Sequence, residues 1–78
     1  MYDVRFFKVD KFDYEVGEEK WVAAIKTDFV PRIGDNVAVL SDTDALEVID
    51  VKLYYDIDEE NEEYNPVAEV YLIAEDAE

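Results

Sequence analysis

Residues 46–75, LEVIDVKLYYDIDEENEEYNPVAEVYLIAE, decide the fold of this 78-residue chain. Apolar and polar residues alternate on both sides of an acidic segment, residues 56–63. Alternation of this kind, bounded by polar turn residues, is the pattern of a half-buried strand. Two such strands with a short polar connection make an antiparallel hairpin. We therefore predict strands near residues 47–56 and 66–75, the second opened by Pro66, where a proline is tolerated.

The alternation also divides the side chains of this hairpin between two faces. Successive side chains of a strand point to opposite faces of the sheet, and those on one face recur every ~6.6–6.8 Å. The face predicted to lie on the core carries Ile49, Val51, Leu53, Tyr55, Ala68, Val70, Leu72 and Ala74. The opposite face then carries most of the acidic residues and several tyrosines.

The first half of the chain predicts shorter strands. Residues 2–9 are rich in aromatic and β-branched residues, which favour a strand, and residues 10–19 contain Gly17 among acids and indicate a turn. Residues 20–28 fit a strand or a short helix. We prefer the strand, because a second hairpin adds more to a small strand-rich domain than an isolated helical turn does. In either case Trp21 is expected in the core.

The segment around Pro31 and Gly34 predicts a chain reversal before a third short strand, residues 36–41. The chain is thus expected to be all-β: a small five-stranded antiparallel barrel or bent sheet. The turn resembles one found in small SH3-like barrels of phages and mobile elements. That resemblance covers about residues 29–73 and is carried by Pro31-Arg32-Ile33-Gly34-Asp35-x-Val37, Val48-Ile49-Asp50-Val51 and Val70-Tyr71-Leu72. It implies a fold only, because such barrels have many unrelated functions.

Composition indicates one folded domain. Leu, Ile, Val and Phe make up 24 of the 78 residues, more than a highly charged disordered chain contains. There is no cysteine, so a disulfide or a thiolate metal site is excluded. The N-terminal residues lack the basic and apolar blocks of a signal peptide, and no apolar run is long enough for a transmembrane helix. We therefore expect a cytoplasmic protein.

Charge is the most unusual property of the sequence. Twenty-two acidic residues and seven basic ones give a net charge of −15, two to four times the magnitude usual for a small domain. Residues 53–78 hold ten acids and no base. A chain with this charge is not expected to bind nucleic acid or an anionic membrane directly.

The residue types disfavour catalysis and a specific metal site. The chain has no histidine, no cysteine and one serine, Ser41, so the common general bases and nucleophiles are mostly missing. Carboxylate pairs carry little information where acids are so frequent. The spacing of Asp56, Asp58 and Glu60 is similar to the start of a calcium loop. However, Asn61 stands where an EF-hand has glycine, and Val67 stands where it has the bidentate glutamate. We predict no enzyme, cofactor or metal.

The remaining hypothesis is a protein-binding module. A stiff row of carboxylates resembles a row of phosphates, and tyrosines among them would supply interface anchors. We expect the partner to be a basic surface of a nucleic-acid-binding protein, which would make the chain a DNA-mimic inhibitor of phage or mobile-element origin. The candidate partner-binding residues are Asp50, Tyr54, Asp56, Asp58, Glu59, Glu60, Glu62, Glu63, Tyr64, Glu69, Tyr71 and Glu75.

The alternative is a small structural or assembly protein whose acidity serves solubility only. In that case Phe6 or Phe7 and the strand edges would make contacts between identical copies, since a dimer enlarges a small core. The sequence leaves both a monomer and a homodimer open.

Overall fold

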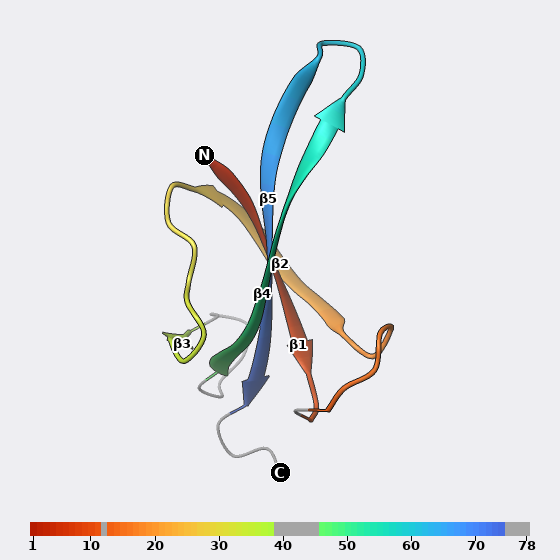
Figure 1. Ribbon diagram of the computed structural model, residues 1–78. Coiled ribbons are helices and arrows are strands. Elements are labelled where there is room, and N and C mark those ends of the chain that lie inside the picture. The colour runs from red at the N-terminus through yellow and green to blue at the C-terminus, as the bar shows by residue number, and fades with distance from the viewer. Residues whose placement is uncertain (12, 39–45, 75–78) are drawn as a thin grey trace.

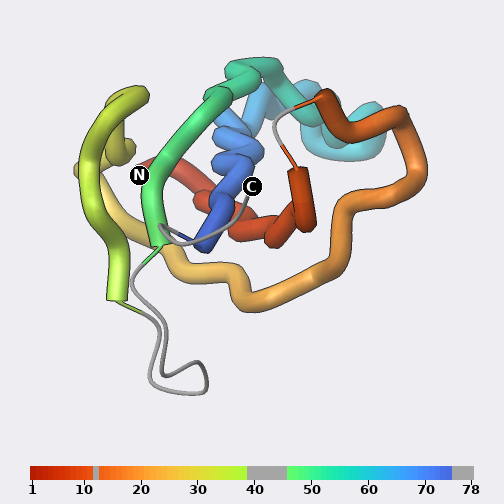
Figure 2. The backbone as a smooth tube through the Cα atoms, turned by 90° about the horizontal axis from the view of Figure 1, so that it is seen from below, coloured from red at the N-terminus to blue at the C-terminus, as the bar shows by residue number. Residues whose placement is uncertain are grey.

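The computed structural model describes residues 1–11, 13–38 and 46–74, which form one curled five-stranded sheet. The strands are β1 (Tyr2–Val9), β2 (Lys20–Thr27), β3 (Asn36–Val37), β4 (Leu46–Asp58) and β5 (Glu63–Ala74). Their order in the sheet is β2-β1-β5-β4-β3 (Figure 1). The sheet curls into a half-barrel, and the segment between β2 and β3 arches along one side of it (Figure 2). The all-β prediction and the strand reading of residues 20–28 are confirmed; the described residues contain no helix.

The sheet is mixed, so the prediction of a fully antiparallel one was wrong. β1 pairs with β5 in parallel, from Asp3 opposite Val67 to Val9 opposite Ile73, whereas the other neighbours are antiparallel. β5 is therefore central and lies between β1 and β4. Its run from Val70 to Ile73 is buried at every position, as expected for a strand covered on both faces.

A bulge in β4 alters the predicted core face. The register with β5 shifts between Val48 and Asp50, so Val48 and Val51 face the same side although they are three residues apart. The extra residue, Ile49, joins the cluster on the opposite face. The prediction that Ile49 lies on the face of Val51 was therefore wrong, because a bulge resets strict alternation.

The main core lies inside the curl of the sheet. It consists of buried residues from β1, β4 and β5, namely Val4, Phe6, Leu46, Val48, Ala68, Val70 and Leu72. The segment between β2 and β3 contributes Val30 to the packing. Gly34, at φ 96°, donates its N–H to the carbonyl of Val48, and the N–H of Val48 donates to the carbonyl of Asp35, both at 2.9 Å. This predicted turn therefore anchors the segment to β4. Of the third strand, predicted over residues 36–41, the structure shows Asn36–Val37; residues 39–41 lie outside the described part.

A smaller cluster occupies the outer face of the sheet. Val9, Tyr71 and Ile73 are buried there. The rings of Phe7, Tyr71 and Tyr14 form a stack in which neighbouring centroids are 5.5 Å apart and tilted by 20°. Trp21 contacts the edge of Phe7 but remains 60% exposed, so its expected place in the core was wrong. The stack fastens the segment after β1 to the sheet.

β4 and β5 run past the other strands and form a projecting ribbon. Pairing with β1 stops at Val67, so residues 55–66, which we call the arm, have only each other as strand partners. The arm projects at one end of a molecule that measures 44 × 24 × 20 Å (Figure 1). Pro66 lies inside β5 and not at its start as predicted. It is tolerated because β1 does not reach it, so its missing N–H removes no bond to that neighbour.

Candidate protein-binding surface on the hairpin arm

The pairing register gives the arm two chemically different faces. On one face Asp56 lies opposite Asn65, and Asp58 lies opposite Glu63. The other face carries the two pairs Tyr55–Pro66 and Ile57–Tyr64. The two residues of a cross-strand pair point their side chains to the same face of the sheet. The arm is therefore acidic on one face and apolar on the other.

Among the described residues, no carboxylate of the acidic face forms an ion pair; ion pairs join Met1 to Asp28, Arg5 to Asp3 and Lys20 to Asp10. The one cation among those residues that acts on the face is Arg5, whose pKa is raised mainly by its hydrogen bond to Asp3 and also by Asp56. The turn at the end of the arm adds Glu59, Glu60 and Glu62, all exposed. Unpaired like charges held close together produce a strong local field, which is available to a basic partner.

The turn at the end of the arm is held by Asp58. Its carboxylate accepts hydrogen bonds from the side chain of Asn61 at 2.9 Å and from the N–H of Glu60 at 3.1 Å. The hydrogen bond from Asn61 is the main cause that lowers the pKa of Asp58 below its usual value. Glu62 takes the left-handed conformation, at φ 53°, that closes the turn. Asp58 thus fixes the turn that carries the neighbouring glutamates.

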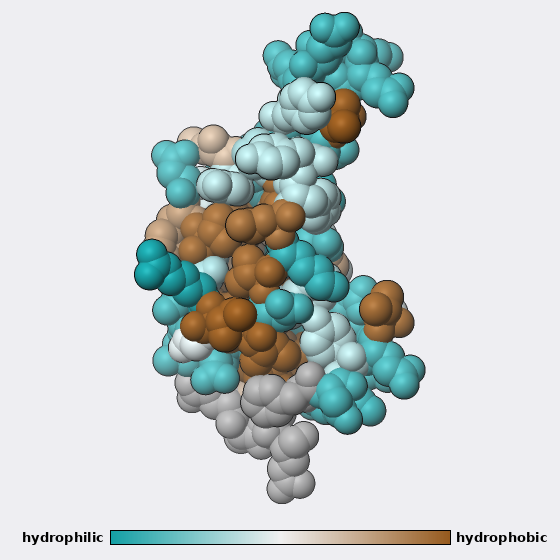
Figure 3. All heavy atoms as spheres, in the orientation of Figure 1, coloured by the Kyte–Doolittle hydropathy of each residue, from teal (hydrophilic) through white to brown (hydrophobic). Residues whose placement is uncertain are grey.

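The apolar face is more exposed than its composition would suggest. Leu53, Tyr55, Ile57 and Tyr64, which we call the apolar strip, are 64%, 68%, 55% and 66% exposed. At its base the strip meets a shallow groove lined by Val30, Pro31, Arg32, Ile33, Val51 and Leu53. Figure 3 shows hydrophobic residues gathered on the body of the molecule below the hydrophilic end of the arm. A continuous apolar surface with an acidic border is a feature of interaction sites.

The structure separates the predicted binding residues into two groups. Those brought together on the arm are Asp56, Asp58, Glu59, Glu60, Glu62, Glu63 and Tyr64. Tyr54 lies at the base of the arm, where its hydroxyl accepts a hydrogen bond of 3.4 Å from Arg5. Asp50, Glu69 and Tyr71 lie further down the outer face, and Glu75 falls outside the described residues.

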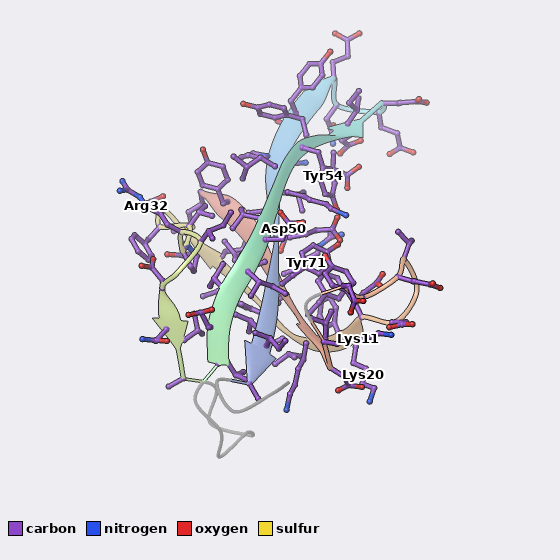
Figure 4. The ribbon with its side chains drawn as sticks, turned by 60° about the horizontal axis from the view of Figure 1, so that its bottom comes forward. Lys11, Lys20, Arg32, Asp50, Tyr54 and Tyr71 are labelled. Atoms are coloured by element: carbon purple, nitrogen blue, oxygen red, sulfur yellow. The ribbon has the colours of Figure 1, made fainter. Side chains whose placement is uncertain are left out.

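Tyr71 was expected at the surface and is instead 4% exposed. It is sandwiched between Phe7 and Tyr14, with the ammonium of Lys52 5.0 Å from its ring centre. Figure 4 shows Tyr71 on the side of the molecule that carries Lys11 and Lys20, away from Arg32. Tyr71 therefore stabilises the fold and is not available as an anchor for a partner.

Sequence reasoning missed the apolar strip, because it assigned Leu53 and Tyr55 to the core. The predicted hairpin strands, residues 47–56 and 66–75, were too short to show the mismatch. In the structure β1 and β2 have eight residues each, whereas β4 and β5 have thirteen and twelve, so the shorter strands cannot flank the whole hairpin. The end of the hairpin that has no neighbouring strand must then expose the apolar side chains that alternate along it.

The aromatic stack predicts a loss of stability at alkaline pH. Burial is the main cause that raises the pKa of Tyr71 from 10.0 to about 12, and nearby Glu69 adds to it. The pKa of Tyr14 is raised in the same direction, also mainly by burial. Because the folded state favours the neutral phenol, this contribution is complete below pH 10 and is lost as pH rises towards 12.

We expect the free energy of unfolding to fall by about 2 kcal/mol between pH 10 and pH 12 from Tyr71. Urea titrations across this range measure it. Tyr71→Phe keeps the ring but cannot ionise, so its free energy of unfolding should fall less over the same pH range. Titration of the lysines affects both proteins equally. An identical loss in both proteins would show that ionisation of Tyr71 has no part in it.

Other classes of site find little support in the described residues. No three acidic side chains there converge closely enough to hold a metal ion. The same residues include no helix of the length and apolarity needed to cross a bilayer. Comparisons of the chain with protein-family models, with curated proteins and with solved structures find no match.

Proposed function

We propose that this protein is a non-catalytic binding module that presents the acidic face of the arm to a basic surface of another protein. The observation that carries the proposal is the lack of any cation paired with the arm carboxylates in the described residues. Charges compensated within the fold would give little attraction, whereas uncompensated ones accelerate encounter with a basic surface.

The class of partner follows from the geometry of the acids. Asp56 and Asp58 point to the same side of a strand, two residues apart, which corresponds to a spacing of ~6.6–6.8 Å. With the turn glutamates they form a short negative row on a projecting support. Such a row resembles the phosphates of a nucleic-acid strand, so we propose that the partner is a nucleic-acid-binding protein and that the arm occupies its basic site.

An SH3-like relationship remains part of this proposal. It is supported by the turn from Pro31 to Asp35, which is hydrogen-bonded to β4 through Val48. The parallel pairing of β1 with β5 does not add to that support. The function proposed above does not depend on the relationship, because it rests on the arm.

Affinity capture at two salt concentrations tests the proposed function. The immobilised protein should retain basic, nucleic-acid-binding proteins from a lysate at 0.05 M salt and release them at 0.5 M, where the Debye length is about threefold shorter. Added DNA should compete for the captured proteins. Recovery of no basic protein at low salt, or capture that DNA leaves unchanged, would contradict the proposal.

A further inference from the structure

The apolar strip raises a question that the acidic face does not answer. Charge accelerates association, but the energy that holds an interface together comes mainly from a few buried apolar and aromatic side chains. Two of the four side chains of the strip are tyrosines, a residue type enriched in such anchors. Both tyrosines lie on the face of the arm opposite to Asp56. A partner attracted by the acids can therefore reach them by extending around the edge of the same two-stranded ribbon.

The strip continues into the body of the molecule. Leu53 belongs both to the strip and to the groove formed with Val30, Pro31 and Ile33. Ile33 is itself 67% exposed, and among the described residues that line the groove Arg32 alone is charged. Within the described residues this surface is left open, because each of the four side chains of the strip is more than half exposed.

The charge around the strip selects its occupant. Glu59 and Glu62 border the outer end of the strip beside Ile57 and Tyr64, and the chain has no base after Lys52. A second copy would bring a second set of these unpaired carboxylates to the first, at a net charge of −15 for each chain. Like charges placed together oppose association, whereas lysine or arginine beside an apolar side chain would satisfy both parts of the surface.

We propose that the apolar strip and the adjoining groove form the docking surface for a basic amphipathic segment of the partner, whose apolar side chains cover Leu53, Tyr55, Ile57 and Tyr64. Flanking lysine or arginine residues of that segment contact the glutamates at the end of the arm. The inference rests on the proposed function and assigns its binding energy to the apolar face, with the acidic face providing the attraction.

Three synthetic peptides of ten residues test the assignment by calorimetry. The first has six lysines and four leucines, the second has serine in place of each leucine, and the third has glutamate in place of each lysine. We expect the lysine–leucine peptide to bind at least tenfold more tightly than the lysine–serine peptide, and the glutamate peptide not to bind. Ile57→Ser should remove most of the difference, and we expect the variant to keep the fold because Ile57 is 55% exposed and belongs to neither core cluster.

Val16→Ser is the matched control, since Val16 is 93% exposed on the segment between β1 and β2 and far from the arm in sequence. It should bind all three peptides as the native chain does. Equal affinity for the two lysine peptides would overturn this inference but leave the proposed function intact. Failure of both lysine peptides to bind would overturn the proposed function and the inference with it. Sedimentation as a dimer that Ile57→Ser abolishes would show that the strip is covered by a second copy, and would also overturn the inference.

Discussion

Leu72→Ala is expected to destabilise the protein by about 2–5 kcal/mol, the range for removing a large aliphatic side chain from a core. Leu72 is completely buried in the main core. It lies on the central strand, opposite Lys8 of β1 and Val48 of β4. A neighbouring side chain therefore cannot fill the cavity without disturbing the strand pairing on both sides. A domain of this size has a small margin of stability, and a loss at the upper end of the range would leave much of the population unfolded.

Leu53→Ala is the matched control, because it makes the same chemical change on the same hairpin. Leu53 is 64% exposed, so its truncation should cost well below 1 kcal/mol. Urea denaturation followed by far-ultraviolet circular dichroism measures both variants. Similar losses in the two would contradict the assignment of Leu72 to the core and of Leu53 to the exposed strip.

The second large effect concerns the rate of association with a basic partner. Replacing Glu59, Glu60 and Glu63 by glutamine removes three unpaired charges from the arm. We expect the association rate with a basic protein recovered by affinity capture to fall about tenfold at low salt, and the difference to vanish at high salt. The dissociation rate should change much less, because the apolar strip is untouched.

A control variant with the same change in charge isolates the position of the acids. Asp13→Asn, Glu15→Gln and Glu18→Gln neutralise three exposed acids on the segment between β1 and β2. If net charge alone attracts the partner, both triple variants will slow association equally in stopped-flow measurements. If the arm directs it, the variant of the arm will be slowed several-fold more than the control.

Local patterns were sufficient to predict β1, β4 and β5, whereas residues 20–28 also fitted a short helix. Alternation identified the hairpin of β4 and β5, and β-branched and aromatic content identified β1. The turn at Gly34 was also predictable, because a residue at positive φ followed by Asp35 is a local property of the chain. The acidic end of the hairpin was predictable from the order of the residues along the chain alone.

Pairing between distant segments was not predictable from those patterns. The parallel contact of β1 with β5 joins residues more than sixty positions apart, and alternation is the same for either strand direction. The bulge at Ile49 is equally invisible, because an extra apolar residue in an apolar stretch leaves no mark. These two features decide which side chains are buried, and they explain the wrong placement of Ile49 and Tyr71.

For the same reason, the acidic part of the candidate surface was predicted and the apolar part was not. The acids of the arm follow one another in the sequence, so a local reading found them. The apolar strip depends on where β1 stops pairing with β5, at Val67, which is a property of the assembled sheet. Leu53 and Tyr55 therefore look like core residues by their sequence pattern, but their position in the sheet leaves them exposed.

The central claim is that the arm is a fixed ribbon that holds its two faces apart. Nuclear Overhauser spectroscopy of the labelled protein in solution tests this most directly, through contacts across the arm. The structure predicts cross-strand backbone contacts between Tyr55 and Pro66 and between Ile57 and Tyr64, with heteronuclear relaxation in residues 55–58 and 63–66 close to that of β5. Absent cross-strand contacts, with relaxation typical of a mobile chain in those residues, would contradict both the acidic row and the apolar strip.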